Sequence, residues 1–204
     1  ELVWIDLRRI SGSGQHAASR IIDCVRRGNG QSVWTSLPVG VVTLAERFGG
    51  CEVTPDVFEA MVTYVAALIA PFEERHAFRK RISGSAVHFL GTSGTVTTVA
   101  GIQLGLPRYD RSKVDGCWMK VGDVNRVTYD LLNRTYEQRV AEPCIGHDRA
   151  DLVLAGCAIL EAIIRAWPCE RLRVADRGLR EGILSSLMME DNTFCAGRRR
   201  RRGE

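Results

Sequence analysis

The feature that most constrains the fold is a short apolar segment that leads into a glycine turn and then into a helix-forming stretch. Residues 86–90 are mostly apolar, and the turn that follows is Gly91, Thr92, Ser93, Gly94 and Thr95. The next residues favour a helix that ends near Leu104, before Gly105 and Pro107. A strand, a glycine turn and a helix in this order indicate an α/β fold.

The remaining chain mixes expected strands with expected helices. Strands are predicted over residues 1–9, 31–37 and 172–175, and helices over residues 43–48, 54–81, 123–139, 149–167 and 179–189. Residues 11–30 are rich in Gly and Ser at both ends and are interpreted as a long connection. Thr54, Pro55 and Asp56 open one helix well, while residues 149–167 are apolar nearly all round and predict a central buried helix.

Composition favours a globular protein away from membranes. The chain has 204 residues, 45% of them hydrophobic, which suffices for one ordinary domain with a core. No signal-peptide pattern opens the sequence, so we expect a cytoplasmic protein. The most apolar run, residues 61–72, is short for a bilayer span and is followed at once by charged residues, so we expect a buried helix and no membrane association.

The positive charge is concentrated at one end. The formal net charge is +4, and five arginines near the carboxy terminus account for it, which leaves the rest of the chain close to neutral. These are Arg198, Arg199, Arg200, Arg201 and Arg202. We interpret residues 192–204 as a basic disordered tail, with a weak nucleic-acid contact as the alternative.

Cysteines and histidines do not form a recognisable site. The seven cysteines are scattered without a Cys-x-x-Cys pair, so neither a disulfide framework nor a zinc site is predicted. A metal, if one takes part, is expected to be a hard cation bound together with phosphate. Cys144, next to Pro143, is a nucleophile in one interpretation and a small buried structural residue in the other.

The glycine turn is the best local candidate for binding an anion. Glycines let backbone amides approach a phosphate, the following helix offers its N–H groups and positive dipole end, and Thr and Ser add hydroxyl donors. The turn is neither a Walker A loop nor a dinucleotide fingerprint. The alternative is an ordinary helix entry capped by Thr92 or Ser93.

Two further places carry arginines that suit phosphate. Arg180 lies in a second strand-to-helix junction, where it either holds phosphate oxygens or pairs with Glu181. Glu181 itself either binds a metal-coordinated water or complements the helix dipole. Arg149 heads the expected buried helix and either contacts a ligand or pairs with Asp148 or Asp151.

Several segments taken together resemble the exopolyphosphatase / guanosine pentaphosphate phosphohydrolase (Ppx/GppA) family. The matching segments are SLPVGVVTL at 36–44, ERF at 46–48, GTSGT at 91–95, residues 149–160 with GCAIL at 156–160, and LREG at 179–182. Their order and spacing fit over residues 1 to 190, although residues 11–30 depart from the family's usual short hairpin.

The resemblance implies an actin/Hsp70/sugar-kinase-like fold of two ribonuclease-H-like lobes, each an α/β unit with a mixed sheet and packed helices. Residues 1–191 look like the second, carboxy-terminal lobe. The family's first lobe, with its phosphate-binding turns and catalytic Glu, has no counterpart in this sequence, so the catalytic residues are unknown. The carried-over phosphate- or nucleotide-binding residues are Gly91, Thr92, Ser93, Gly94, Thr95, Arg149 and Arg180.

The implied activity is hydrolysis of a terminal phosphoanhydride in polyphosphate or pppGpp, with Mg²⁺ as the implied cofactor and the missing amino-terminal lobe as an implied partner. Two alternatives remain open at this point. One is a noncatalytic remnant that binds phosphate or nucleotide, and the other is an RNA-associated protein that acts through its arginine tail.

Overall fold

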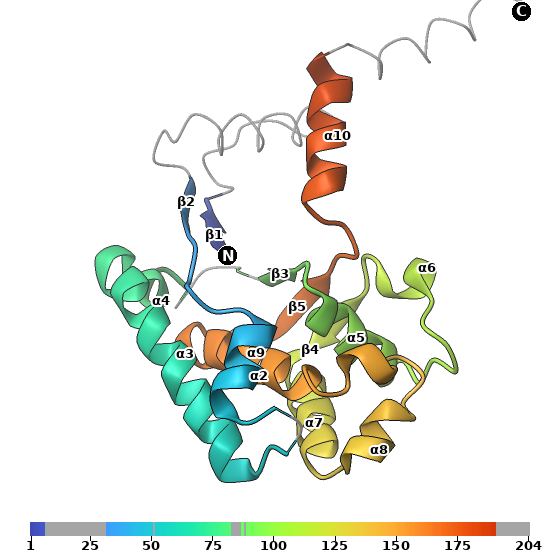
Figure 1. Ribbon diagram of the computed structural model, residues 1–204. Helices are drawn as coiled ribbons and strands as arrows, with labels where there is room; N and C mark the ends of the chain where they lie inside the picture. The colour runs from blue at the N-terminus through green and yellow to red at the C-terminus, as the bar shows by residue number, and fades with distance from the viewer. Residues whose placement is uncertain (7–31, 51, 83–86, 88, 191–204) are drawn as a thin grey trace, which may run out of the picture. The chain divides into compact units, whose positions relative to one another are not determined.

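The computed structural model describes residues 1–6, 32–50, 52–82, 87 and 89–190 (Figure 1). The chain divides into a larger unit, Pro38–Asp176, and a smaller unit made of Glu1–Leu37 and Arg177–Glu204. The predicted connection at 11–30 and the predicted tail at 192–204 lie outside the described residues.

The larger unit is built on a mixed three-stranded sheet. Its strands are β3 (Phe89–Gly91), β4 (Trp118–Lys120) and β5 (Arg171–Val174), in the order β3-β5-β4. β3 runs parallel to β5, whereas β4 runs antiparallel to it. A mixed sheet with packed helices confirms the α/β fold predicted from the sequence.

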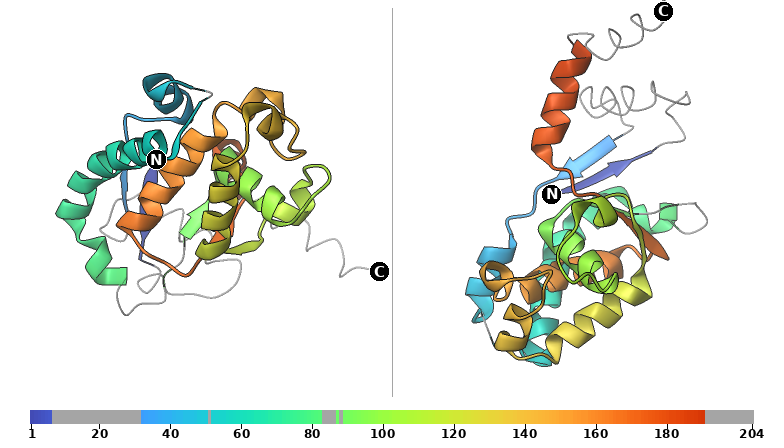
Figure 2. Two further views of the ribbon diagram at one scale, coloured as in Figure 1. Left: turned by 90° about the horizontal axis from the view of Figure 1, so that it is seen from below. Right: turned by 90° about the vertical axis from the view of Figure 1, so that its right-hand side faces the viewer.

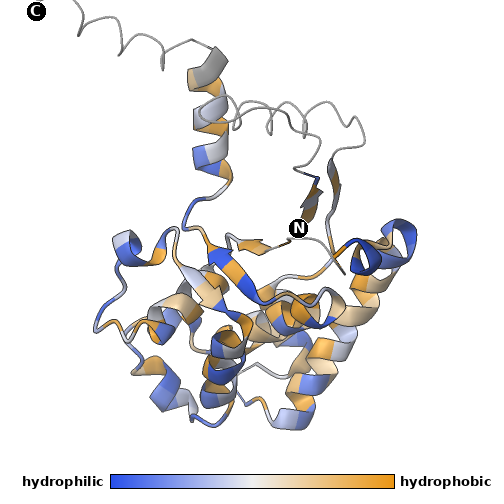
Figure 3. Cartoon of the chain, turned by 180° about the vertical axis from the view of Figure 1, so that it is seen from behind, coloured by the Kyte–Doolittle hydropathy of each residue, from blue (hydrophilic) through white to orange (hydrophobic). Residues whose placement is uncertain are grey.

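Each strand turns alternate residues to opposite faces of this sheet. Leu172 and Val174 of β5 and Met119 of β4 are buried, whereas Arg171 and Arg173, which alternate with the buried residues along β5, are exposed. Figure 3 shows the corresponding change of hydropathy along β5. One face of the sheet therefore contributes to the core of the larger unit.

Two long helices contribute much of the remaining core. α3 (Pro55–His76) and α9 (Val153–Ala166) lie side by side (Figure 2). Met61, Val65 and Ile69 of α3 recur every four residues and are at most 1% exposed. This spacing gives one buried face, so the helix packs against α9 through that face.

α3 is also the one helix among the described residues that is long and apolar enough to cross a membrane by length and composition. Core helices pass the same test, and in Figure 3 this helix carries hydrophilic as well as hydrophobic residues along its length. Its buried face accounts for its apolar content.

The start of α3 is as expected, but its end is not. The Thr54 side chain accepts a hydrogen bond from Val57 N at 3.3 Å, and Pro55 follows at the first helical position. The helix stops at His76, because Ala77 has a left-handed backbone with φ 50°. A short helix, α4 (Phe78–Ile82), continues the chain, so the single helix predicted to residue 81 was wrong at its end.

The segment between the helix predicted to end near Leu104 and the helix predicted at 123–139 contains a short helix and a strand that were not predicted. α5 (Gly94–Gln103) is followed by α6 (Arg111–Val114), by β4, and by α7 (Val121–Leu132). The predicted helix at 123–139 is in fact two helices, since α8 (Tyr136–Val140) has its own cap in Thr135. Asp123 lies in the first turn of α7, and Lys120 stands at the cap position.

The helix predicted at 149–167 begins later than expected. A 3₁₀ turn, η2 (His147–Arg149), precedes α9, which starts at Val153. α2 (Val41–Phe48) begins two residues before the helix predicted at 43–48. It ends as predicted, before Gly49, whose φ of 94° suits glycine. The smaller unit contains an antiparallel pair, β1 (Leu2–Ile5) and β2 (Ser32–Thr35), and the helix α10 (Leu179–Glu190).

Candidate phosphate-binding site

Parallel pairing brings two loops to the same edge of the sheet. Gly91, the last residue of β3, lies opposite Val174, the last residue of β5. Ala175 N donates a hydrogen bond of 2.9 Å to Gly91 O and extends the pairing by one residue. The glycine turn and Asp176 therefore leave the sheet together, at the carboxyl ends of parallel strands where α/β proteins bind ligands.

The glycine turn opens α5. Ser93 caps the helix, because its hydroxyl accepts a hydrogen bond of 3.3 Å from Val96 N. Of the two capping residues considered from the sequence, Ser93 is the one used. The N–H groups of Gly94 and Thr95 stand in the first turn and have no acceptor within the helix, so they remain available to an anion.

Gly94 does not supply an unusual backbone angle, since it is not among the glycines with positive φ in the described chain. Because Gly94 has no side chain, it leaves space between the start of α5 and Arg149. A Cβ at Gly94 would lie 3.6 Å from Arg149 Nη1 and 3.9 Å from Arg149 Cζ. The guanidinium of Arg149 thus lies directly beside the first turn of α5.

Arg149 does not head the buried helix, contrary to the prediction. It ends η2, ahead of α9, and it is exposed. Its side chain makes no hydrogen bond or ion pair with any residue that the structure describes, so the pairing with Asp148 or Asp151 is not formed. Asp148 instead lies 3.8 Å from His147 Nδ1.

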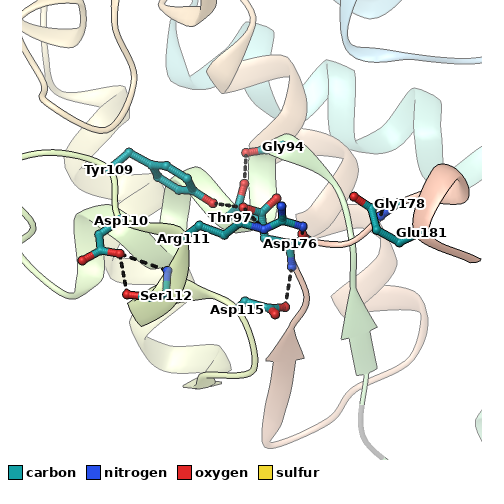
Figure 4. A network of polar contacts seen from close by, with 10 residues as sticks. All are labelled: Gly94, Thr97, Tyr109, Asp110, Arg111, Ser112, Asp115, Asp176, Gly178 and Glu181. Carbon is teal, nitrogen blue, oxygen red and sulfur yellow. Dashed lines mark hydrogen bonds and ion pairs between the residues drawn. The ribbon is translucent and has the colours of Figure 1, made fainter. Parts of the chain in front are cut away.

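A cluster of polar side chains surrounds Asp176 at the same edge (Figure 4). Tyr109 donates a hydrogen bond of 2.7 Å from its hydroxyl to Asp176 Oδ2, and Arg111 Nε lies 3.4 Å from that oxygen. Arg111 Nη2 also donates to the carbonyl of Asp176. The Asp176 backbone N–H donates to Asp115 Oδ1 at 3.0 Å.

The contacts around Asp176 shift the pKa of Tyr109. Burial and the hydrogen bond to the Asp176 carboxylate raise the pKa of Tyr109 to about 12. Tyr109 therefore remains a hydrogen-bond donor at neutral pH. Tyr109, Arg111 and Asp115 were not predicted as site residues from the sequence. The available signal was the position of Asp176 two residues after a strand.

The second strand-to-helix junction belongs to the smaller unit. Glu181 accepts a hydrogen bond of 2.7 Å from Gly178 N and so supports the start of α10. This contact fits the interpretation in which Glu181 stabilises the helix start rather than binding a metal-coordinated water. The Arg180 side chain forms no ion pair within the described ranges, so the pairing with Glu181, one of its two interpretations, is not formed. Arg180 as a phosphate ligand stays a prediction.

The described residues contain no group of three or more His, Cys, Asp or Glu side chains that could hold a metal ion. Cys144 is buried, burial raises the pKa of its thiol, and its Sγ lies 3.7 Å from Leu106 O. These properties fit the structural interpretation of Cys144 rather than a reactive nucleophile.

A comparison with models of protein families shows which family this chain belongs to. The model of the Ppx/GppA phosphatase family matches residues 26–191. The chain belongs to this family. A comparison with curated protein sequences found no match.

Solved structures agree with this membership. A Ppx/GppA family member from Aquifex aeolicus is 26% identical with a TM-score of 0.64, and the match covers 78% of this chain and 49% of that one. An exopolyphosphatase from Cytophaga hutchinsonii is 21% identical with a TM-score of 0.66 and has the same fold. That match covers 78% of this chain and 51% of the other one. The chain thus spans about half the length of these relatives.

Proposed function

We propose that this chain provides a phosphate-binding lobe of a phosphoanhydride hydrolase that removes the terminal phosphate of polyphosphate or pppGpp. Membership of the Ppx/GppA phosphatase family supports the reaction class, and one similar solved structure is named an exopolyphosphatase. The match to about half of each relative supports the idea that this chain is one lobe of a two-lobe protein. The resemblance of residues 1–191 is the reason for proposing the second, ribonuclease-H-like lobe.

The observation that carries the proposal is the pairing of Arg149 with the first turn of α5. Phosphate oxygens accept hydrogen bonds from N–H groups at a helix N-terminus, and a guanidinium binds two oxygens at once. Gly94 keeps the space between them free of a side chain. Both donor types lie at the carboxyl edge of β3, where a phosphate chain would meet them.

Asp176 has a positioning role in this proposal. Its carboxylate already accepts from Tyr109 and faces Arg111, so much of its charge is offset. A carboxylate without these partners would repel phosphate at this edge. With them, Asp176 instead links the loop that carries Tyr109 to the end of β5. The positive character of Arg149 and of the helix end then dominates the edge.

Hydrolysis needs a water in line with the terminal phosphorus and a base that positions it. The larger unit supplies donors for the phosphate oxygens, while the base is proposed to come from the complementary lobe. Mg²⁺ is proposed to accompany the phosphate chain and to offset its charge, with ligands from that lobe and from the substrate. We also propose that the protein acts in the cytoplasm.

Phosphate release from polyphosphate and from pppGpp tests the proposal. The purified chain alone is expected to release phosphate far below rates of about 1 per second, which are typical of slow enzymes. Turnover should appear when the first lobe of a Ppx/GppA relative is added. Enzyme-like release by the chain alone, abolished by Arg149→Gln, would show a complete site in this chain. Binding without turnover in the presence of the added lobe would favour the noncatalytic remnant.

A further inference from the structure

The face of the three-stranded sheet that points away from the core carries an unusual set of side chains. We call it the basic sheet face, and it consists of Leu90, Trp118, Lys120, Arg171 and Arg173. All five are exposed, with Leu90 at 62% and Trp118 at 42%. Large apolar side chains this accessible, set among three cations, indicate a surface that binds something.

The strand register places these residues side by side. Arg173 of β5 lies opposite Leu90 on one side and opposite Trp118 on the other, and Arg171 lies opposite Lys120. Side chains on one face of neighbouring strands are about 5 Å apart at Cβ. The five residues therefore form one continuous surface across all three strands, and Figure 1 shows β5 running along the sheet beside β3.

The arginines are arranged around the tryptophan. Arg171 Cζ lies 4.4 Å from the centre of the Trp118 ring, and Arg173 Cζ lies 5.6 Å from it. Arg173 Nε also donates to Gly116 O at 3.3 Å, which holds this side chain in place. Cation–π contacts of this kind keep both guanidiniums close to an aromatic plane.

No acidic side chain neutralises this face within the described part of the chain. Lys120, Arg171 and Arg173 form no ion pair there. Of the nearest acids along the two strands, Asp115 accepts a hydrogen bond from the Asp176 N–H, and Glu170, which lies just before β5, forms no ion pair with a described residue. The face therefore keeps three uncompensated positive charges.

We propose that the basic sheet face binds single-stranded RNA. Three cations suit phosphates, while an aromatic ring and planar guanidiniums suit unstacked bases, the combination that sheet-based binders of single strands use. Inorganic polyphosphate and an acidic peptide would also bind the three cations, but a chain of phosphates has no group that packs on the exposed apolar surface of Trp118 and Leu90, whereas a nucleobase does. This surface shares no residue with the edge at Gly94 and Arg149, so the proposal does not depend on the proposed hydrolase activity.

The test is binding of a labelled 12-nucleotide oligouridylate, followed by fluorescence anisotropy with the full chain. The variants are Trp118→Leu, which keeps an apolar side chain but removes the ring, Trp118→Phe, and Arg171→Glu. Arg75→Glu on α3 is the matched control, because it makes the same charge change at an exposed arginine elsewhere. RNA binding of the same variants is also measured in a chain whose five arginines at 198–202 are changed to Gln, so that the contribution of the tail to RNA binding can be subtracted.

We expect Trp118→Leu to weaken RNA binding by roughly fivefold or more, since stacking of one base contributes about 1–3 kcal/mol. Trp118→Phe should restore most of the affinity, and Arg171→Glu should exceed Arg75→Glu in its effect. Polyphosphate of matched charge should bind Trp118→Leu as well as it binds the unchanged chain. Equal RNA affinities for Trp118→Leu and the unchanged chain, or equal losses for Arg171→Glu and Arg75→Glu, would overturn the proposal.

Discussion

The guanidinium of Arg149 lies beside Gly94, so that a Cβ at Gly94 would be 3.6 Å from Arg149 Nη1. The two residues come from different elements, the end of η2 and the start of α5, and the fold alone brings them together. The positions of these two residues make the phosphate-binding proposal testable by small substitutions.

Gly94→Ala is expected to weaken phosphate binding without loss of stability. The new Cβ meets Arg149 only at ordinary contact distance, and alanine favours a helix by up to about 1 kcal/mol over glycine. It would, however, occupy the space that a phosphate oxygen needs to approach the backbone amides. Calorimetric titration with tripolyphosphate should show a several-fold lower affinity, with an unchanged or raised melting temperature.

The control for Gly94→Ala is Gly122→Ala in the first turn of α7, where a Cβ meets nothing within 4 Å. This variant should bind tripolyphosphate as the unchanged chain does. Loss of stability in Gly94→Ala, with the affinity of the folded protein unchanged, would make the turn a structural helix entry only.

Gly156→Ala is expected to destabilise the larger unit by about 1–3 kcal/mol, the usual cost of overpacking. A Cβ there would collide with the side chain of Thr95, whose Cγ2 would be 2.8 Å away, because α9 packs closely against the first turn of α5 at this point. Urea unfolding measures the change, with Gly122→Ala as the comparison. A free energy of unfolding within about 0.5 kcal/mol of the unchanged chain would show that the two helices separate easily.

Tyr109→Phe should change the response to alkali. The folded-state pKa of Tyr109 is raised from 10.0 to about 12, so the protonated form is favoured by folding. The resulting stabilisation is present below pH 10 and is lost as the pH rises from about 10 to 12. Thermal unfolding of the unchanged chain should therefore show a component of alkaline destabilisation that Tyr109→Phe lacks.

Tyr129→Phe is the control for that comparison, since Tyr129 is 67% exposed on α7. It should follow the unchanged chain at every pH. The same alkaline loss in Tyr109→Phe as in the unchanged chain would mean that the Tyr109–Asp176 hydrogen bond contributes nothing measurable.

The sequence predicted those parts of the fold that depend on local signals. The opening of α3 at Thr54 and Pro55, the glycine turn before α5 and the buried stretch of α9 were all visible, because caps, glycines and apolar periodicity act over a few residues. β4 was missed, since a three-residue strand has too few positions to show alternation. Likewise, the left-handed Ala77 that ends α3 has no sequence signature.

The candidate site was predictable only in part, because local sequence signals do not show which distant residues come together. The glycine turn and Arg149 were both named from the sequence, but their proximity depends on how η2 and α5 pack. Tyr109, Arg111 and Asp115 reach Asp176 through contacts across more than fifty positions of sequence. Nothing local distinguishes such residues from those of an ordinary loop.

The central claim is that Arg149 and the first turn of α5 bind phosphate. Its most direct test is calorimetric titration of tripolyphosphate into the unchanged chain, Arg149→Gln and the control Arg75→Gln, at a salt concentration high enough to suppress nonspecific binding. Arg149→Gln should bind about tenfold or more weakly, because a hydrogen bond to a charged group contributes about 1.5–3 kcal/mol. It should unfold at the same temperature, since the side chain has no partner among the described residues. Equal affinities for Arg149→Gln, Arg75→Gln and the unchanged chain would contradict the account.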